Sequence, residues 1–383
     1  MYLEIDGLKY YLNDNIAKVV SSIQKSISHL IIPNIITYQG RDYCVSSIEN
    51  DAFKDFTELQ SVIIPNSVNS IGNGTFENCS SLQSIEIPDS VTKIGHRAFR
   101  DCTALDTLNI PNGVTIIGQE AFMYCISLMS VKLPKCLKYI GANAFEGCIW
   151  IESISIPKSV MVIGDSAFSA CRNLKTVIIE DGDKVLDFVD SSLTSNNLYS
   201  CGERKNNCFT ACEIETLYLG RNIEYLSDSP FRSLSSLRKL IIGNKVTEIG
   251  ESAFCNCGKL SQITIPHSVT SIKKSAFKAC EGISSIIIPN SVKVIESSAF
   301  CKCSNLSLVT IEDGDNAIEV RYPSPFVKCP IKTLHLGRDI LYNQDNSPFR
   351  YQKNLQKVSF GSGIKTIPES LFADCTNFKV TNT

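Results

Sequence analysis

Residues 82–105 read Leu-Gln-Ser-Ile-Glu-Ile-Pro-Asp-Ser-Val-Thr-Lys-Ile-Gly-His-Arg-Ala-Phe-Arg-Asp-Cys-Thr-Ala-Leu, and this stretch decides the fold. The same pattern returns every 23 residues along much of the chain. The phenylalanine of each regular copy marks the spacing: Phe53, Phe76, Phe99, Phe122, Phe145 and Phe168. A fixed period in this range is typical of solenoid proteins, in which each copy forms one coil.

The first half of the repeat predicts two short strands. Ile85 and Ile87 alternate with polar residues, which is the pattern of a strand with one buried face. Pro88 ends this strand because it lacks a backbone N–H donor. Residues 91–94 form a second apolar run, and we expect Gly95 to end it by adopting a positive φ.

The second half of the repeat predicts a short helical turn. Ala98, Cys102 and Leu105 stand at i, i+4 and i+7, with Phe99 beside them. One such unit cannot bury its apolar face alone, so successive coils must stack and pair their strands in parallel. The phenylalanine anchors predict a right-handed leucine-rich-repeat-like solenoid of about 14 coils.

The regular repeat does not cover the whole chain. Residues 1–44 hold short strand patterns and turn signals instead, which predicts an N-terminal β-rich cap, and residues 45–383 form the solenoid. Two irregular inserts interrupt it, near 180–208 and 312–325. Both begin with Glu-Asp-Gly-Asp and are followed by matching segments, so a unit of several coils is duplicated. The first copy carries extra residues near 191–207, which predicts a projecting loop.

Composition excludes several classes of function. The net charge of the 383-residue chain is −2, which does not favour nucleic acid or an anionic membrane surface. There is no apolar run long enough for a membrane-spanning helix. Residues 1–6 lack the basic and apolar regions of a signal peptide, so a cytoplasmic location stays open.

The 17 cysteines recur mostly at one repeat position. We expect them to be buried free thiols, because neighbouring coils hold their Cβ atoms in parallel rather than facing each other. Cys201, Cys208 and Cys212 could bind a metal, but their spacing is not the usual pairing of a zinc site. The Glu-Asp-Gly-Asp segments could hold calcium, although a simple turn explains them equally well.

Nothing in the sequence predicts an enzyme or a cofactor. The four histidines are scattered and, at His96 and His267, occupy variable positions expected on the solvated surface. Stacking the coils groups no nucleophile with a base, and there is no glycine-rich phosphate loop.

The best candidate site is the outward face of the first strands. A rigid sheet that carries variable side chains suits binding of another macromolecule, although a solvated face would show similar residues. The coils on either side of the first insert place apolar and planar side chains there. The candidate partner-binding residues are Ile178, Thr216, Tyr218, Lys239, Ile241, Gln262 and Thr264.

The motif Leu-x-x-Ile-x-Ile-Pro-x-Ser-Val-x-x-Ile-Gly-x-x-Ala-Phe-x-x-Cys resembles the BspA-type leucine-rich repeat over residues 45–380. The resemblance implies a secreted or cell-surface location and, for some members, adhesion to host matrix proteins or other cells. We therefore expect a non-enzymatic interaction or adhesion protein that binds a protein partner through its strand face and insert loop. A glycan-binding surface protein and a passive structural spacer are the alternatives.

Overall fold

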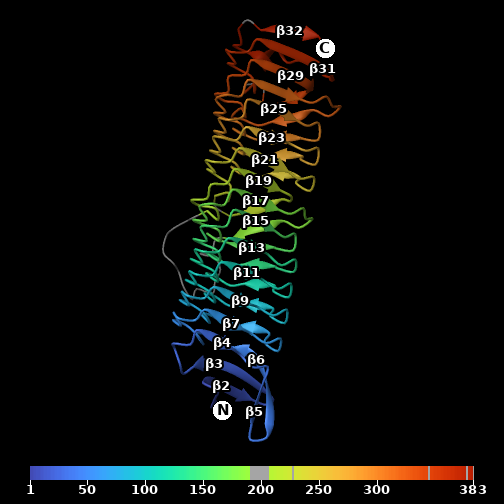
Figure 1. Ribbon diagram of the computed structural model, residues 1–383. Helices are drawn as coiled ribbons and strands as arrows, with labels where there is room; N and C mark the ends of the chain where they lie inside the picture. The colour runs from blue at the N-terminus through green and yellow to red at the C-terminus, as the bar shows by residue number, and fades with distance from the viewer. Residues whose placement is uncertain (190–206, 227, 344–345, 377, 383) are drawn as a thin grey trace. The chain divides into compact units, whose positions relative to one another are not determined.

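The computed structural model describes residues 1–189, 207–226, 228–343, 346–376 and 378–382. Contacts divide the chain into two compact units: Met1–Lys175 with Leu186–Cys212, and Thr176–Val185 with Glu213–Thr383. Each unit is a β-solenoid, and the chain contains about 14 coils spaced about 23 residues apart (Figure 1). The predicted fold class is confirmed.

In the first unit, most coils contribute one short strand to a parallel sheet. Ser61 pairs with Ser84, and Thr107 pairs with Ser130, so equivalent repeat positions lie side by side. The central residue of each strand is buried and its neighbours face outward. The strands of this sheet are β4 (His29–Ile31), β7 (Ser61–Ile63), β9 (Ser84–Glu86), β11 (Thr107–Asn109) and β13 (Ser130–Lys132). Strand β15 (Ser153–Ile156) is the first strand of the coil that follows β13.

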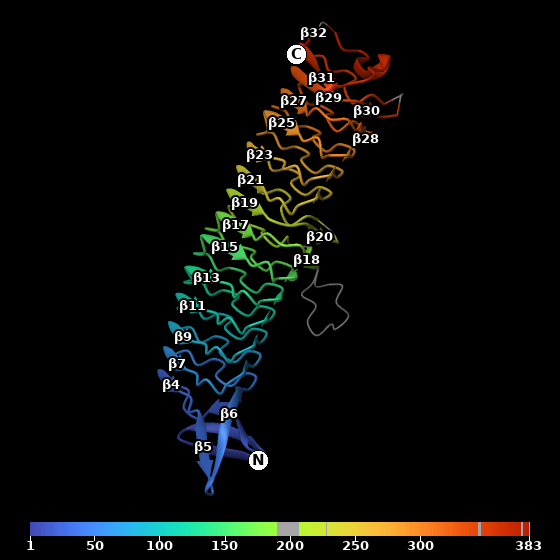
Figure 2. The same ribbon diagram turned by 90° about the vertical axis from the view of Figure 1, so that its right-hand side faces the viewer.

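A second row of strands lies across each coil from the first (Figure 2). Its members in this unit are β8 (Ser70–Ile71), β10 (Lys93–Ile94), β12 (Ile116–Ile117), β14 (Tyr139–Ile140), β16 (Val162–Gly164) and β18 (Leu186–Val189). They pair in parallel from each coil to the next.

Antiparallel strands precede the regular coils. Strands β1 (Tyr2–Ile5), β2 (Leu8–Asn13) and β3 (Ile16–Ser22) form a meander, and β5 (Ile35–Tyr38) forms a hairpin with β6 (Arg41–Ile48). Strand β3 also pairs in parallel with β6, and β4 pairs with β7 of the next coil. Coil-like pairing therefore begins before residue 45, while the boundary of a separate cap stays a prediction.

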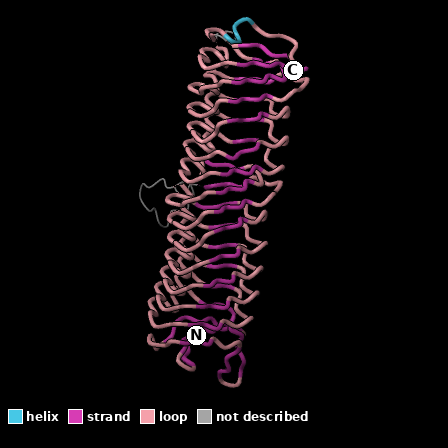
Figure 3. The backbone as a smooth tube through the Cα atoms, turned by 45° about the horizontal axis from the view of Figure 1, so that its top comes forward, coloured by secondary structure: helices cyan, strands magenta, loops and turns pink. Residues whose placement is uncertain are grey.

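The second unit repeats the two rows of strands (Figure 3). The first row comprises β17 (Thr176–Ile179), β19 (Thr216–Leu219), β21 (Lys239–Ile242), β23 (Gln262–Thr264), β25 (Ser285–Ile288), β27 (Leu308–Ile311), β29 (Thr333–Arg338), β31 (Lys357–Gly363) and β32 (Lys379–Asn382). The second row comprises β20 (Ile223–Tyr225), β22 (Glu248–Ile249), β24 (Ser271–Ile272), β26 (Val294–Ile295), β28 (Ile318–Val320) and β30 (Ile340–Leu341).

A ladder of phenylalanine rings runs through the core of each unit. The rings of Phe99, Phe122 and Phe145 are buried, and consecutive centroids lie 5.2 and 5.3 Å apart with nearly parallel planes. In the second unit the centroids of Phe254 and Phe277 lie 5.5 Å apart in the same arrangement. The stacked and buried anchors expected from the repeat are confirmed.

The segment expected to form a helical turn folds differently. The one helix of the described residues is the 3-10 helix η2 (Glu369–Phe372). In the repeat at Phe99, Arg97 and Asp101 both have positive φ, of 56° and 57°, which interrupts a right-handed helix. The N–H groups of Phe99 and Asp101 instead donate to the carbonyls of Ala121 and Met123 in the next coil, both at 2.8 Å. The coils are thus joined by backbone hydrogen bonds on this side too.

Gly95 does not adopt the positive φ expected of it. Its role is close approach of two backbones, because a Cβ atom at Gly95 would lie 2.4 Å from the carbonyl oxygen of Gly72. In the same way, a Cβ atom at Gly118 would lie 2.5 Å from the carbonyl carbon of Gly95. Glycine at this repeat position therefore sets how tightly successive coils stack.

The recurring cysteine is buried on the turn side of most coils that carry it. The Cys102 Sγ donates a hydrogen bond to the Phe76 carbonyl of the preceding coil, at 3.2 Å, and Cys125 does the same to Phe99. Burial raises the pKa of the Cys79 thiol to about 12. These cysteines are free thiols that add one polar contact between coils.

Candidate functional site

The apolar candidates of the strand face form one continuous row in the second unit. Ile178 of β17 pairs with Tyr218 of β19, which pairs with Ile241 of β21. Ile178 and Ile241 keep 39% and 38% of their surface exposed, and Tyr218 is half-buried. Neighbouring parallel strands are about 4.8 Å apart, so the three side chains lie next to one another and form one continuous surface.

A polar row runs parallel to this apolar row on the same face. Thr216 pairs with Lys239, and Lys239 pairs with Gln262 of β23. Thr264 continues the row of Ile241 on β23. All seven sequence-predicted residues therefore lie together on four consecutive strands, β17, β19, β21 and β23. We call this set the strand-face site.

The first Glu-Asp-Gly-Asp segment fixes the position of Tyr218. The Tyr218 hydroxyl donates a hydrogen bond to the Asp181 carboxylate at 2.8 Å, and this bond raises the pKa of Tyr218. The hydroxyl therefore stays protonated at neutral pH. A Cβ atom at Gly243 would lie 2.9 Å from the Tyr218 oxygen and 2.6 Å from Asp181 Oδ1, so glycine is needed there for the pair to fit.

The duplicated segment repeats this arrangement with a different ring. Asp313 takes the place of Asp181, and its Oδ1 lies 3.4 Å from His335 Nε2. The other ring nitrogen of His335 is hydrogen bonded to Ser359 at 2.9 Å. Gly361 occupies the place of Gly243, since a Cβ there would meet Asp313 Oδ1 at 1.7 Å. An acid, a ring and a glycine thus recur together.

Sequence reasoning found the residues of the row but missed Asp181 and Gly243, which position its central ring. The duplication held the signal. Asp181, Tyr218 and Gly243 match Asp313, His335 and Gly361 at equivalent places of the two copies. His335, which the sequence presented only as one of four scattered histidines, belongs to the second copy of this duplicated arrangement.

The acidic turn uses its carboxylates within the protein. Asp181 accepts from Tyr218, and Asp183 forms an exposed ion pair with Lys245 at 2.8 Å. Across the described residues, the structure groups no three His, Cys, Asp or Glu side chains that could hold a metal ion.

The cysteines near the first insert are poorly suited to a metal. Burial raises the pKa of Cys208 and of Cys212, the latter to about 12, which disfavours the thiolate that binds zinc. The Cys212 Sγ instead donates to the Phe168 carbonyl at 3.0 Å. Cys201 and residues 191–206 of the predicted loop near 191–207 lie outside the described residues.

Comparison with known proteins identifies the repeat. The model of the BspA type leucine rich repeat region matches residues 46–175, 202–322 and 272–383, in six copies. The chain belongs to this family. The strand, the proline that follows it and the turn with phenylalanine and cysteine are therefore parts of one repeating unit of this family. Among curated proteins, none matches the chain.

The chain is also similar to solved structures from several bacteria. A leucine rich cell surface protein of Faecalibacterium prausnitzii is 23% identical, with a TM-score of 0.50, and the match covers 100% of this chain and 95% of that one. A leucine-rich repeat protein of Bacteroides ovatus is 25% identical, with a TM-score of 0.46 and 99% of both chains covered. A leucine-rich repeat protein of T. pallidum is 29% identical, with a TM-score of 0.43, over 48% of this chain and 86% of that chain.

The BspA-type repeat is generally a non-enzymatic interaction module. Relatives such as the Faecalibacterium protein are cell-surface proteins. A search of the described part of the chain finds no helix with the length and apolar character needed to cross a membrane.

Proposed function

We propose that this protein is a non-enzymatic adhesion or interaction protein that binds a protein partner through the strand-face site. We also propose that it acts at the cell surface, as its relatives do. Membership in the BspA-type family supports both statements at the level of the repeat. The choice of surface comes from the arrangement of the second unit.

The single observation that carries the proposal is the row Ile178–Tyr218–Ile241. Exposed large aliphatic side chains are common singly on protein surfaces, but here two of them flank an aromatic ring on adjacent strands. Protein interfaces draw most of their binding energy from a few such anchors, surrounded by polar residues that exclude water. Thr216, Lys239 and Gln262 supply that polar surround.

The composition of the row favours a protein over a glycan or a passive spacer. Sugars are bound mainly on aromatic planes, and the strand-face site has one ring between two isoleucines. A spacer needs no ordered anchor, whereas Tyr218 is held by Asp181 across a contact that requires Gly243. A ring held before binding loses less rotational freedom when the partner docks, which strengthens binding.

The test is a binding screen of the full chain against immobilised extracellular matrix proteins and a glycan array. For a protein that binds, Tyr218→Ala is expected to weaken affinity by about 1–2 kcal/mol or more, because it removes the central anchor. Ile241→Asp is expected to weaken it further by placing a charge in the apolar row. Tyr218→Phe keeps the ring and is expected to retain most of the affinity.

Matched controls separate this site from the rest of the strand face. Ile63→Asp changes an isoleucine that is 54% exposed at the equivalent position of β7, in the first unit, and Ser84→Ala changes a small polar residue of β9. Both are expected to leave affinity unchanged. The proposal is refuted if a partner is found and its affinity survives both Tyr218→Ala and Ile241→Asp in folded variants.

A further inference from the structure

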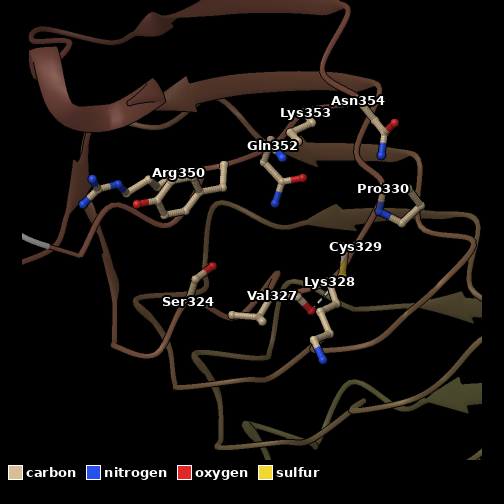
Figure 4. A pocket seen from close by; sticks show the side chains of 10 residues that line it. Ser324, Val327, Lys328, Cys329, Pro330, Arg350, Gln352, Lys353 and Asn354 are labelled. Carbon is tan, nitrogen blue, oxygen red and sulfur yellow. Dashed lines mark hydrogen bonds between the residues drawn. The ribbon is translucent and has the colours of Figure 1, made fainter. Parts of the chain in front are cut away.

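A cavity of about 400 Å³ opens on the turn side of the second unit, away from the strand-face site (Figure 4). It lies between two consecutive coils, the one that contains Phe326 and the one that contains Phe349. Residues 324–330 form one wall and residues 350–354 form the other. Its volume is within the range of small-molecule sites in proteins.

After its cysteine, the coil below the cavity is one residue shorter than the regular coils. In the regular coils two residues separate the recurring cysteine from the next core residue, as in Cys303-Ser-Asn-Leu306. In the coil below the cavity only Pro330 separates Cys329 from Ile331, whereas the coil above keeps two residues. The cavity lies beside this shortened segment, since Cys329 and Pro330 line it.

Gln352 replaces cysteine in the coil above the cavity. It is 7% exposed, and its Nε2 donates to the Phe326 carbonyl at 3.4 Å, the same contact that the cysteine thiols make in other coils. Glutamine has an additional N–H and a carbonyl oxygen that a thiol lacks. Figure 4 shows this amide directed into the space above Val327 and Cys329.

The rim of the cavity is basic and carries an aromatic ring. Lys328, Arg350 and Lys353 line it, and none of the described residues that line it is acidic. Arg350 is held by Asp374 at 2.9 Å, and its guanidinium lies 4.7 Å from the centre of the Tyr351 ring. Tyr351 is 60% exposed, so part of its ring stays open to solvent beside Arg350.

We propose that this cavity binds a sugar that carries a carboxylate, such as the terminal residue of an acidic glycan. The amides of Gln352 and Asn354 match sugar hydroxyls, which both donate and accept. The Tyr351 ring offers a plane for the C–H face of the sugar, and Lys353 and Lys328 supply positive charge for the carboxylate. This site is independent of the strand-face site and does not rest on it.

The test titrates the full chain with 3′-sialyllactose, glucuronic acid and the neutral sugar lactose, followed by calorimetry and ligand-observed NMR. Both acidic sugars are expected to bind saturably, and lactose at least about tenfold more weakly. Tyr351→Ala and Gln352→Cys are each expected to lower the affinity for the acidic sugars by about tenfold. Gln352→Cys restores the cysteine of the other coils, so the contact to Phe326 and the fold are preserved.

The matched control is Tyr322→Ala, which removes a 66% exposed tyrosine of the same unit that does not line the cavity. It is expected to bind as the wild type does. The proposal is overturned if neither acidic sugar binds at millimolar concentration. It is equally overturned if lactose binds as well as they do, or if binding persists in both cavity variants. Adenosine monophosphate binding in place of the sugars would assign the cavity to a nucleotide and reject the sugar.

Discussion

Replacing Phe122 by alanine removes one ring from the middle of the core ladder of the first unit. The ring is fully buried and lies 5.2 Å from Phe99 and 5.3 Å from Phe145, centre to centre. The substitution therefore deletes a whole buried side chain and two aromatic contacts. The coils above and below are tied by backbone hydrogen bonds such as Phe122 N to Ala144 O, at 2.8 Å, which oppose collapse into the space.

The expected loss of stability follows from these contacts. Phenylalanine-to-alanine changes in closed cores cost about 3–5 kcal/mol, from lost transfer free energy and the remaining cavity. Each stacked aromatic pair adds about 0.5–1.5 kcal/mol beyond burial. Since the two neighbouring coils are held apart by their own hydrogen bonds, we expect Phe122→Ala to fall in the upper part of the 3–5 kcal/mol range.

The measurement is equilibrium unfolding in urea, followed by circular dichroism and by tyrosine fluorescence to detect separate transitions of the two units. Met129→Ala is the control in the same unit, because Met129 is 66% exposed and its loss should shift stability by less than about 0.5 kcal/mol. A loss below about 1 kcal/mol for Phe122→Ala would show that the ring ladder does not hold the coils together.

Two further predictions concern polar groups inside the coils. The buried thiols should resist thiol reagents in the native protein and react with them in denaturant. Because burial raises the folded-state pKa of Cys79 to about 12, the free energy of unfolding should be constant below the ordinary thiol pKa near 9 and fall as the pH rises above it. A free energy of unfolding that stays flat to pH 11 would contradict this. Ser229→Ala should cost about 2 kcal/mol or more in urea unfolding, since the Ser229 hydroxyl accepts from Phe231 N at 3.2 Å and donates to the Ala253 carbonyl at 2.8 Å. Ser252→Ala, at the same repeat position, should cost under about 1 kcal/mol because Phe254 N donates directly to the Ala276 carbonyl. Equal losses for the two variants would reject the bridging role of Ser229.

The fold was predictable because its signals are local and repeated. The alternation at Ile85 and Ile87 and the spacing of the phenylalanines recur often enough to fix strand positions and coil number. The outward face of each strand follows directly from the alternation. This is why every residue expected in the strand-face site lies on one surface of adjacent strands.

The turn side of the coil was not predictable by the same rules. Ala98, Cys102 and Leu105 have helical spacing, but the apolar pattern only reports which side chains are buried. The backbone there satisfies its N–H groups with the next coil, through positive φ angles at Arg97 and Asp101. Arginine gives no sign of a left-handed conformation, and aspartate is enriched there without requiring it. The stacking that stabilises this conformation comes from a neighbouring copy rather than from the segment itself.

The duplication shows how this fold turns an irregularity into a possible binding feature. Asp181 and Asp313 each come at the end of a first-row strand, and each reaches a ring on the next strand, Tyr218 or His335. Such contact is possible only where the coil beyond provides a glycine, since a Cβ at Gly243 or Gly361 would overlap the acid. Elsewhere, contacts such as Lys54 with Glu77 and Asn78 with Asp55 join a single pair of side chains from neighbouring coils. At each of the two inserts, the acid, the ring and the glycine instead come from three neighbouring coils. The strand face therefore holds a ring in place where the repeat is broken. The cavity at Gln352 likewise lies beside a coil that is one residue short after its cysteine.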